Sequence, residues 1–123
     1  MQISKKNINK EIGEKIFKAL YQVLADLKKA EEIEKFLNAI LSKTEKTVLA
    51  KRLGIAWYLS QKKSYESIRK ELKVSSATVA TIQRTLEKDK GGLSLAIKTI
   101  EAEIWAREMA SKVKNSVKKI FKK

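Results

Sequence analysis

Apolar residues recur along the first part of the chain at steps of three and four. Between residues 8 and 27 they occupy seven positions, Ile8, Ile12, Ile16, Leu20, Val23, Leu24 and Leu27. Because a helix completes a turn in 3.6 residues, this spacing places them on one helical face. A second, shorter stripe predicts a helix from about Glu31 to Leu41, with its apolar face formed by Ile33, Phe36, Leu37, Ile40 and Leu41.

A third helix is predicted to begin just after Ser42. Ser42 stands three residues before Glu45, which is the spacing of a capping box. The apolar face of this helix is formed by Val48, Leu49, Leu53, Ala56, Trp57 and Leu59. Its end is predicted at residues 61–63, Gln-Lys-Lys, which form a polar turn.

Two short helices and one long helix are expected in the rest of the chain. Ser64 is a favourable N-cap for a helix through Leu72, and Ser75 for a helix from Ser76 to about Glu87. Gly91-Gly92 predicts a break before a helix over 93–121. Its stripe is Ile97, Ile100, Ile104, Trp105, Met109, Val113, Val117, Ile120 and Phe121. Six helices without a strand signal predict an all-α fold, with Trp57 and Trp105 in its core.

Residues 64–88 have the pattern of a helix-turn-helix. Two helices that cross on a three-residue turn need buried residues at fixed positions, including one that fills the corner. These positions are all apolar: Ile68, Leu72, Val74, Val79 and Ile82. The segment departs from the usual motif at Lys73, where glycine is favoured, and at Arg69, where a small residue is usual. The alternative is a pair of ordinary amphipathic helices within a bundle.

The charge of the chain favours a polyanionic partner. Its 28 Lys and Arg residues exceed its 14 Asp and Glu residues, which leaves a formal net charge of +14. Nucleic acid is the commonest partner of such a chain, and an anionic membrane surface is the next. Cations surround the predicted motif at Lys62, Lys63, Arg69, Lys70, Lys73, Arg84 and Lys88.

The second helix of the motif is expected to read DNA. It opens with Ser76, Ala77 and Thr78, whose small side chains allow close approach to base edges. Further contacts from this helix are expected at Ala80, Thr81 and Arg84, while Arg69, Lys70 and Lys73 neutralise phosphates. Tyr65 either caps the helix pair or contacts a phosphate, and we favour the phosphate.

Several classes of chemistry lack the residues they need. The chain has no cysteine and no histidine, which excludes disulfides, Cys/His zinc sites and Cys-His or Ser-His nucleophile pairs. No glycine-rich phosphate loop is present, and we expect neither an enzyme nor a cofactor. The polar Met1–Lys10 segment has no signal core, and the longest apolar run is Ile55–Leu59. A soluble, cytoplasmic, nucleoid-associated protein is expected.

Residues 41–86 resemble the Trp-repressor superfamily, especially its YerC/YecD-type branch. The similarity rests on Leu41, Leu49-Ala50-Lys51-Arg52-Leu53, Ser64-Tyr65-Glu66-Ser67-Ile68 and Ser76-Ala77-Thr78-Val79, and on the two upstream helices. This resemblance implies an intertwined homodimer that presents two recognition helices to successive major grooves of double-stranded DNA. It carries base or backbone contacts onto Arg69, Ser75, Ser76, Ala77 and Ala80.

The resemblance also implies a small-molecule effector site between the core and the recognition helix. In the tryptophan-responsive members two arginines frame the ligand, and Arg52 matches the first of them. Thr81 stands where the second is expected, so we predict that tryptophan does not bind tightly. A structural salt bridge is an equally good interpretation of Arg52.

The basic end of the chain differs from the resembled family, whose last helix is shorter. Residues 111–123 contain six lysines, Lys112, Lys114, Lys118, Lys119, Lys122 and Lys123, and no acidic residue. We predict a helical domain over 1–90 and a basic amphipathic helix over 91–123. That helix is expected to pack over 93–109 and to contact DNA weakly beyond. The alternatives are that it lies on a membrane surface, or that it dimerises or covers the core.

Three functions therefore stay open. A sequence-specific transcription regulator, expected to be a repressor, is favoured by the motif and the resemblance. A nonspecific architectural protein that coats DNA is favoured by the net charge of +14. A membrane-surface or partner-binding helical protein is supported by amphipathicity alone.

Overall fold

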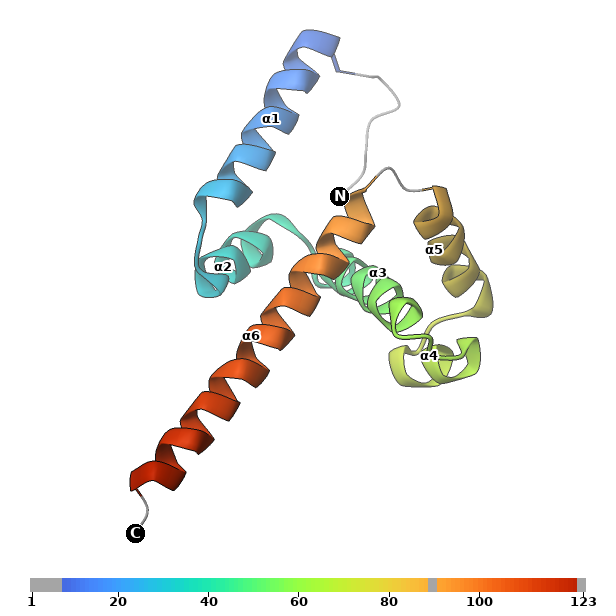
Figure 1. The fold of residues 1–123 in the computed structure, drawn as a ribbon. Coiled ribbons are helices and arrows are strands. Elements are labelled where there is room, and N and C mark those ends of the chain that lie inside the picture. The colour runs from blue at the N-terminus through green and yellow to red at the C-terminus, as the bar shows by residue number, and fades with distance from the viewer. Residues whose placement is uncertain (1–7, 89–90, 122–123) are drawn as a thin grey trace. The chain divides into compact units, whose positions relative to one another are not determined.

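The computed structural model describes residues 8–88 and 91–121 as an all-helical chain (Figure 1). Within these residues there are six helices and no strand, which confirms the expected fold class. They are α1 (Lys10–Asp26), α2 (Ala30–Ile40), α3 (Lys43–Ser60), α4 (Tyr65–Leu72), α5 (Ser76–Lys88) and α6 (Gly92–Phe121). Lys122 and Lys123 of the predicted tail, and Met1 to Asn7, lie outside the described residues. The chain divides into two compact units, Met1–Lys46 and Thr47–Lys123.

Side-chain caps begin the helices where the sequence predicts them. The backbone N–H of Ser42 donates to the Glu45 carboxylate (2.8 Å), and the N–H of Glu45 donates to Ser42 Oγ (3.1 Å). This reciprocal capping box lowers the pKa of Glu45, chiefly through the backbone hydrogen bond from Ser42. Asn9 caps α1, which the sequence analysis did not predict, through one hydrogen bond that its side chain accepts from the N–H of Glu11 (2.9 Å).

The helices α3 and α4 both end on a lysine in the left-handed region. Lys62 has a φ of 62°, and Lys73 has a φ of 55° and a ψ of 55°. After α3, the N–H of Lys63 donates to the Tyr58 carbonyl (3.1 Å); after α4, the N–H of Val74 donates to the Arg69 carbonyl (3.3 Å). These backward hydrogen bonds are those of a Schellman motif, which normally ends on glycine. Lys73 therefore adopts the positive φ for which glycine is favoured, and its side chain makes that conformation strained.

The buried core of the second unit joins four helices. Its members are Ile55 and Ala56 of α3, Ile68 of α4, Val79 and Ile82 of α5, and Ile97 of α6. Half-buried apolar side chains, including Trp57, Leu72 and Val74, pack against this cluster. Of the five positions expected to be buried in the motif, Ile68, Val79 and Ile82 are buried and Leu72 and Val74 are half-buried. Burial of the motif is therefore confirmed in its main part.

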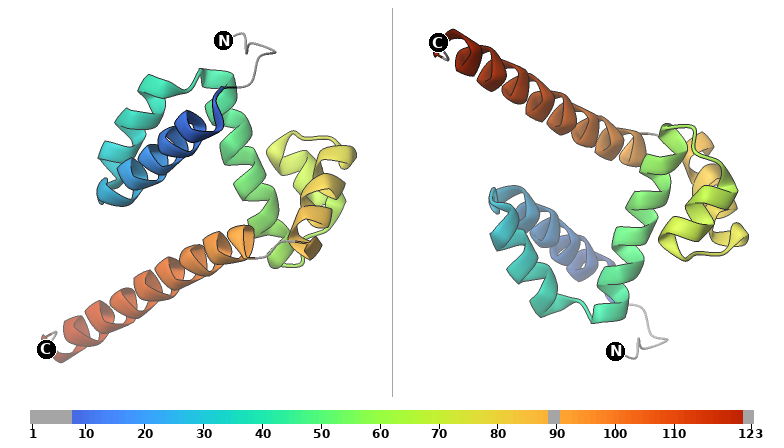
Figure 2. Two further views of the ribbon diagram at one scale, coloured as in Figure 1. Left: turned by 90° about the horizontal axis from the view of Figure 1, so that it is seen from above. Right: turned by 90° about the horizontal axis from the view of Figure 1, so that it is seen from below.

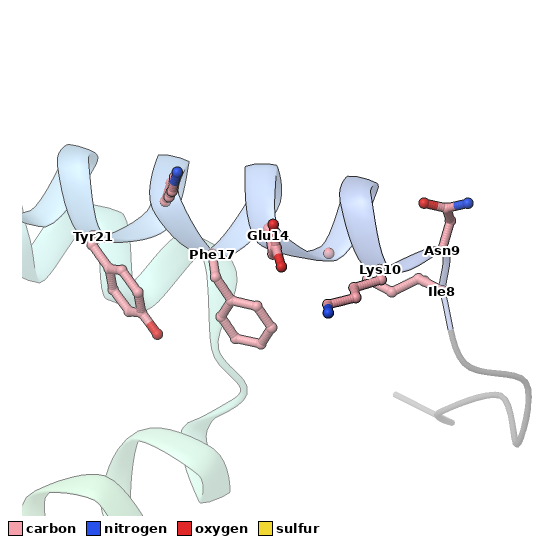
Figure 3. Close-up of a pocket in the computed structure, with 8 residues that line it drawn as sticks. Ile8, Asn9, Lys10, Glu14, Phe17 and Tyr21 are labelled. Carbon is pink, nitrogen blue, oxygen red and sulfur yellow. The ribbon is translucent and has the colours of Figure 1, made fainter.

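The first unit leaves most of its apolar stripe exposed. Ile12 and Ile16 of α1 are each 54% exposed, and Gly13 is the buried residue of this helix. Phe17 and Tyr21 project from the same side of α1, with ring centroids 6.2 Å apart (Figure 3). They border a hollow of about 460 Å³ on this helix. The periodicity identifies the apolar face correctly, but the described residues of this unit cover it only in part, at Leu20 and Leu27.

The last helix packs only through its beginning. Leu93 and Ile97 contact the core of the second unit, and the rest of α6 extends away from α4 and α5 (Figure 2). Trp105 is 63% exposed, so its predicted place in the core is wrong. The reason is geometric, because a helix of 30 residues spans about 45 Å and outruns the small core at its start.

Replacing Ile68 with alanine should lower the free energy of unfolding by about 2–5 kcal/mol, since the side chain is fully buried and its loss leaves a cavity. The matched control is Ile120→Ala, which removes the same atoms from a residue that is 69% exposed. That control should change stability by less than about 0.5 kcal/mol. Urea unfolding followed by circular dichroism measures both, and equal losses would contradict the proposed core.

Candidate nucleic-acid interface

The helices α4 and α5 form a packed pair joined by the three residues Lys73, Val74 and Ser75. Ile68 on one helix and Val79 and Ile82 on the other are buried, which fixes which face of α5 points inward. Since a helix repeats every 3.6 residues, the residues between these buried positions face outward. The outward face of α5 is therefore set by the core.

The N-terminus of α5 is capped from within the turn. Ser75 Oγ accepts from the N–H of Thr78 (3.1 Å) and also pairs with the Thr78 hydroxyl (2.9 Å). Ser76 and Ala77, on the first turn, have small and exposed side chains. The N–H groups of a first helical turn carry a partial positive charge and favour an anion. This end of α5 can therefore approach a phosphate or a base edge closely.

Most of the residues predicted to contact DNA are exposed. On α4 and in the turn these are Tyr65 (40% exposed), Arg69, Lys70, Lys73 and Ser75, and on α5 they are Ser76, Ala77, Thr81 and Arg84. Thr78 and Ala80 are half-buried, so they present less of their surface than we expected. The hydroxyl of Thr78 is also used in the cap of α5.

Thr81 and Arg84 are connected on the outward face of α5. Thr81 Oγ1 donates to the Ala77 carbonyl (2.9 Å), and Arg84 Nη2 donates to the same hydroxyl oxygen (3.3 Å). These bonds orient both side chains along the helix. Neither residue is buried, so both stay accessible to a partner.

Cations of α4 and of the turn line a hollow. Arg69, Lys70 and Lys73, together with Glu66 and Val74, line a space of about 360 Å³. Lys70 forms an exposed ion pair with Glu66 (3.1 Å). This pairing of Glu66 was not predicted, although its spacing of four residues from Lys70 is the helical signal for such a pair. Arg69 and Lys73 therefore offer more available charge than Lys70.

Lys63 interacts with two side chains of the second unit. Its ammonium group forms an ion pair with Glu71 (3.2 Å) and lies 4.1 Å from the centre of the Tyr58 ring. The hydrogen bond from Lys63 is the main reason that the pKa of Glu71 is lowered, and one from Tyr58 adds to it. Counting Lys63 with the free cations around the motif therefore overstates their number.

Lys51 of α3 forms a hydrogen bond with the turn between α4 and α5. Its ammonium group donates to the Lys73 carbonyl (3.1 Å), across 22 residues of sequence. The sequence analysis missed this contact because no local pattern indicates a hydrogen bond over such a separation. It ties the strained residue of the turn to the helix beneath it.

Arg52 borders a cavity between α3 and the turn. The cavity measures about 350 Å³, and its lining is formed by Val48, Lys51, Arg52, Ile55, Lys73, Val74, Ser75 and Thr78. Arg52 itself is exposed. Thr81 is not among these lining residues. The cations that line this cavity are Lys51 and Arg52 from α3 and Lys73 from the turn, and α5 contributes only Thr78.

The comparisons with known proteins identify the class and then the family. The family model described as Trp repressor protein matches residues 15–101, which is more than half of the chain. The chain therefore belongs to the Trp repressor family, a family of DNA-binding regulators. Neither the curated proteins nor the solved structures give a match. The matched region contains α4 and α5 and ends near the middle of the first half of α6.

The described residues provide neither a metal site nor a membrane-crossing helix. Acidic, histidine and cysteine side chains do not gather there in a group that could hold a metal ion. Among the same residues, every helix is too short or too polar to cross a bilayer.

Replacing Lys73 with glycine should raise the free energy of unfolding by about 1 kcal/mol, because glycine adopts a positive φ without the steric cost that a side chain carries. Lys73→Ala is the matched control, since it removes the same charge but keeps a Cβ at this position. Urea unfolding of the two variants separates the backbone effect from the charge effect. If the alanine variant is as stable as the glycine variant, the turn is not strained.

Proposed function

We propose that this chain is a sequence-specific transcription regulator that reads the major groove of DNA with the N-terminal part of α5, and that it acts as a repressor. The observation that carries this proposal is the exposed, small-residue end of α5 at Ser76 and Ala77, which follows directly on the turn that contains Lys73, together with the exposed cation Arg69 on the preceding helix. Membership of a family of DNA-binding regulators supports the same conclusion.

The residues divide into two roles in this proposal. Arg69, Lys73 and Arg84 contact phosphates and supply sequence-independent affinity. Ser76, Ala77 and Thr81 approach base edges, where hydrogen bonds and methyl contacts discriminate between sequences. Tyr65, Lys70, Ser75, Thr78 and Ala80 complete the surface around them, and the caps of both helices fix its geometry.

The proposed active form is a homodimer. Its support is the exposed apolar surface of α1 and of the residues just before it, where Ile8, Ile12, Ile16 and Phe17 are each more than half exposed. A second copy that covers this face removes a large apolar area from water. Two-fold symmetry then presents two copies of α5 to successive major grooves of one DNA duplex. We further place the chain in the YerC/YecD-type branch and at the nucleoid of the cytoplasm.

The proposal includes a small-molecule effector whose identity is not specified. The cavity beside Arg52 is large enough for a small molecule and lies against the turn before α5, so that its occupant could adjust the helix. Tryptophan is not expected to be that effector, because Thr81 replaces the second cation that a sandwich around an indole needs.

Selection of bound duplexes from a random DNA pool is the experiment that tests the function. A sequence-specific homodimer should enrich one pair of inverted half-sites about one helical turn apart. Its affinity for the selected site should exceed that for random DNA by about a thousandfold or more. A pool that stays random, with equally steep salt dependence for every sequence, would instead identify an architectural protein that coats DNA through its net charge of +14.

Replacing Arg69 with alanine should weaken binding to selected and random DNA alike, because a phosphate contact carries no sequence information. The slope of log affinity against log salt should become shallower by about one unit. Lys63→Ala is the control, since Lys63 is already paired with Glu71. Fluorescence anisotropy at several salt concentrations measures both, and an unchanged slope for Arg69→Ala would remove its phosphate role.

Replacing Ala77 with phenylalanine should change the preferred DNA sequence, because a bulky side chain at the exposed end of α5 cannot approach the same base edges. Thr85→Phe is the control on the exposed surface of the same helix, two turns further on. It should leave the preference intact. Repeating the selection with each variant gives the answer, and an unaltered site for Ala77→Phe would argue against insertion of this end into the groove.

A further inference from the structure

The second half of α6 carries an apolar face that the described chain does not cover. Residues 102–121 lie beyond the segment that matches the Trp repressor family. At 3.6 residues per turn, four of their apolar side chains share one face, and Trp105 lies at its edge. The exposed fractions are 40% for Met109, 59% for Val113, 44% for Val117, 69% for Ile120 and 63% for Trp105.

Beyond Glu103 and Glu108, the last part of the same segment, residues 109–121, carries only positive charge on its other faces. Lys112, Lys114, Lys118 and Lys119 are exposed, and residues 109–121 contain neither aspartate nor glutamate. On the helical projection these lysines flank and oppose the apolar face. The segment is therefore a basic amphipathic helix in which charge and apolar surface are separated.

The two faces together select among three partners. Duplex DNA accepts the lysines but leaves the apolar face in water. A second copy of α6 covers the apolar face, but a parallel pairing brings together two copies of residues 109–121, whose charged side chains are all lysines. An anionic lipid surface satisfies both faces, because the apolar side chains enter the acyl boundary and the lysines extend to the headgroup phosphates.

We infer that residues 102–121 of α6 form a lipid-binding helix that lies in the plane of an anionic membrane surface. This inference goes beyond the proposed DNA-binding function and does not depend on it, since it involves other residues. The helix lies on the surface and does not cross it, in agreement with its four lysines and its narrow apolar face.

The natural tryptophans supply a direct probe. The chain has two, and Trp57→Phe leaves Trp105 as the single emitter at the edge of the apolar face. The full chain carrying this substitution is titrated with vesicles of phosphatidylglycerol and phosphatidylcholine, and separately with vesicles of phosphatidylcholine alone. We expect a blue shift of Trp105 emission and co-sedimentation with the anionic vesicles, and a much weaker response to the neutral ones.

Variants separate this binding from general attraction of a basic chain to anionic lipid. Val113→Asn with Val117→Asn keeps the charge and removes apolar contact, so the affinity for anionic vesicles should fall by at least about tenfold. Lys112→Gln with Lys118→Gln should lower it by about fivefold for each lysine. Ser111→Asn, on the polar face, is the matched control and should change neither affinity nor emission. Circular dichroism confirms that each variant folds.

Three results would overturn the inference. Vesicle binding that survives Val113→Asn with Val117→Asn would show charge attraction without insertion. A blue shift that grows with protein concentration in the absence of lipid would assign the apolar face to a second copy. A response to duplex DNA and not to vesicles would assign the lysines to DNA. Arg69→Ala, which tests DNA binding by α4 and α5, should leave vesicle binding unchanged, so the two proposals can fail separately.

Discussion

The buried cluster that joins Ile68 to Val79 and Ile82 is the interaction on which the second unit depends. α4 has only 8 residues, which is too short for a stable helix without tertiary contacts. Its burial against α5 and α3 therefore provides most of the free energy that keeps it helical. The same contact orients α5, because a helix held by two buried residues one turn apart has one outward face. The proposed reading of DNA follows from that orientation.

The helix boundaries and the burial of the motif could be predicted because local physics decides them. The capping box of Ser42 and Glu45 and the cap at Ser64 involve residues three apart, so the pattern is visible in the sequence. The unusual residue at Lys73 was also visible in the sequence, because the turn after such a helix favours glycine at this position. The cap at Asn9 joins residues two apart and was missed because the apolar stripe already begins at Ile8.

The coverings of apolar faces could not be predicted, because periodicity shows which side of a helix is apolar and not what lies on it. Trp105 follows a regular stripe, yet it is largely exposed. Ile16 shows the same limit in the first unit. Contacts between residues distant in sequence could not be predicted either. The hydrogen bond from Lys51 to the Lys73 carbonyl depends on the fold, and no spacing in the sequence indicates it.

The first turn of α5 separates stability from recognition residue by residue. Ser75 and Thr78 cap the start of the helix, and the buried side chains of Val79 and Ile82 pack it against the core. The side chains of Ser76 and Ala77 neither cap the helix nor pack in the core. Exchanges at those two positions are therefore nearly neutral for folding. In evolutionary terms, the surface that would choose a DNA sequence is free to drift while the scaffold beneath it stays under selection.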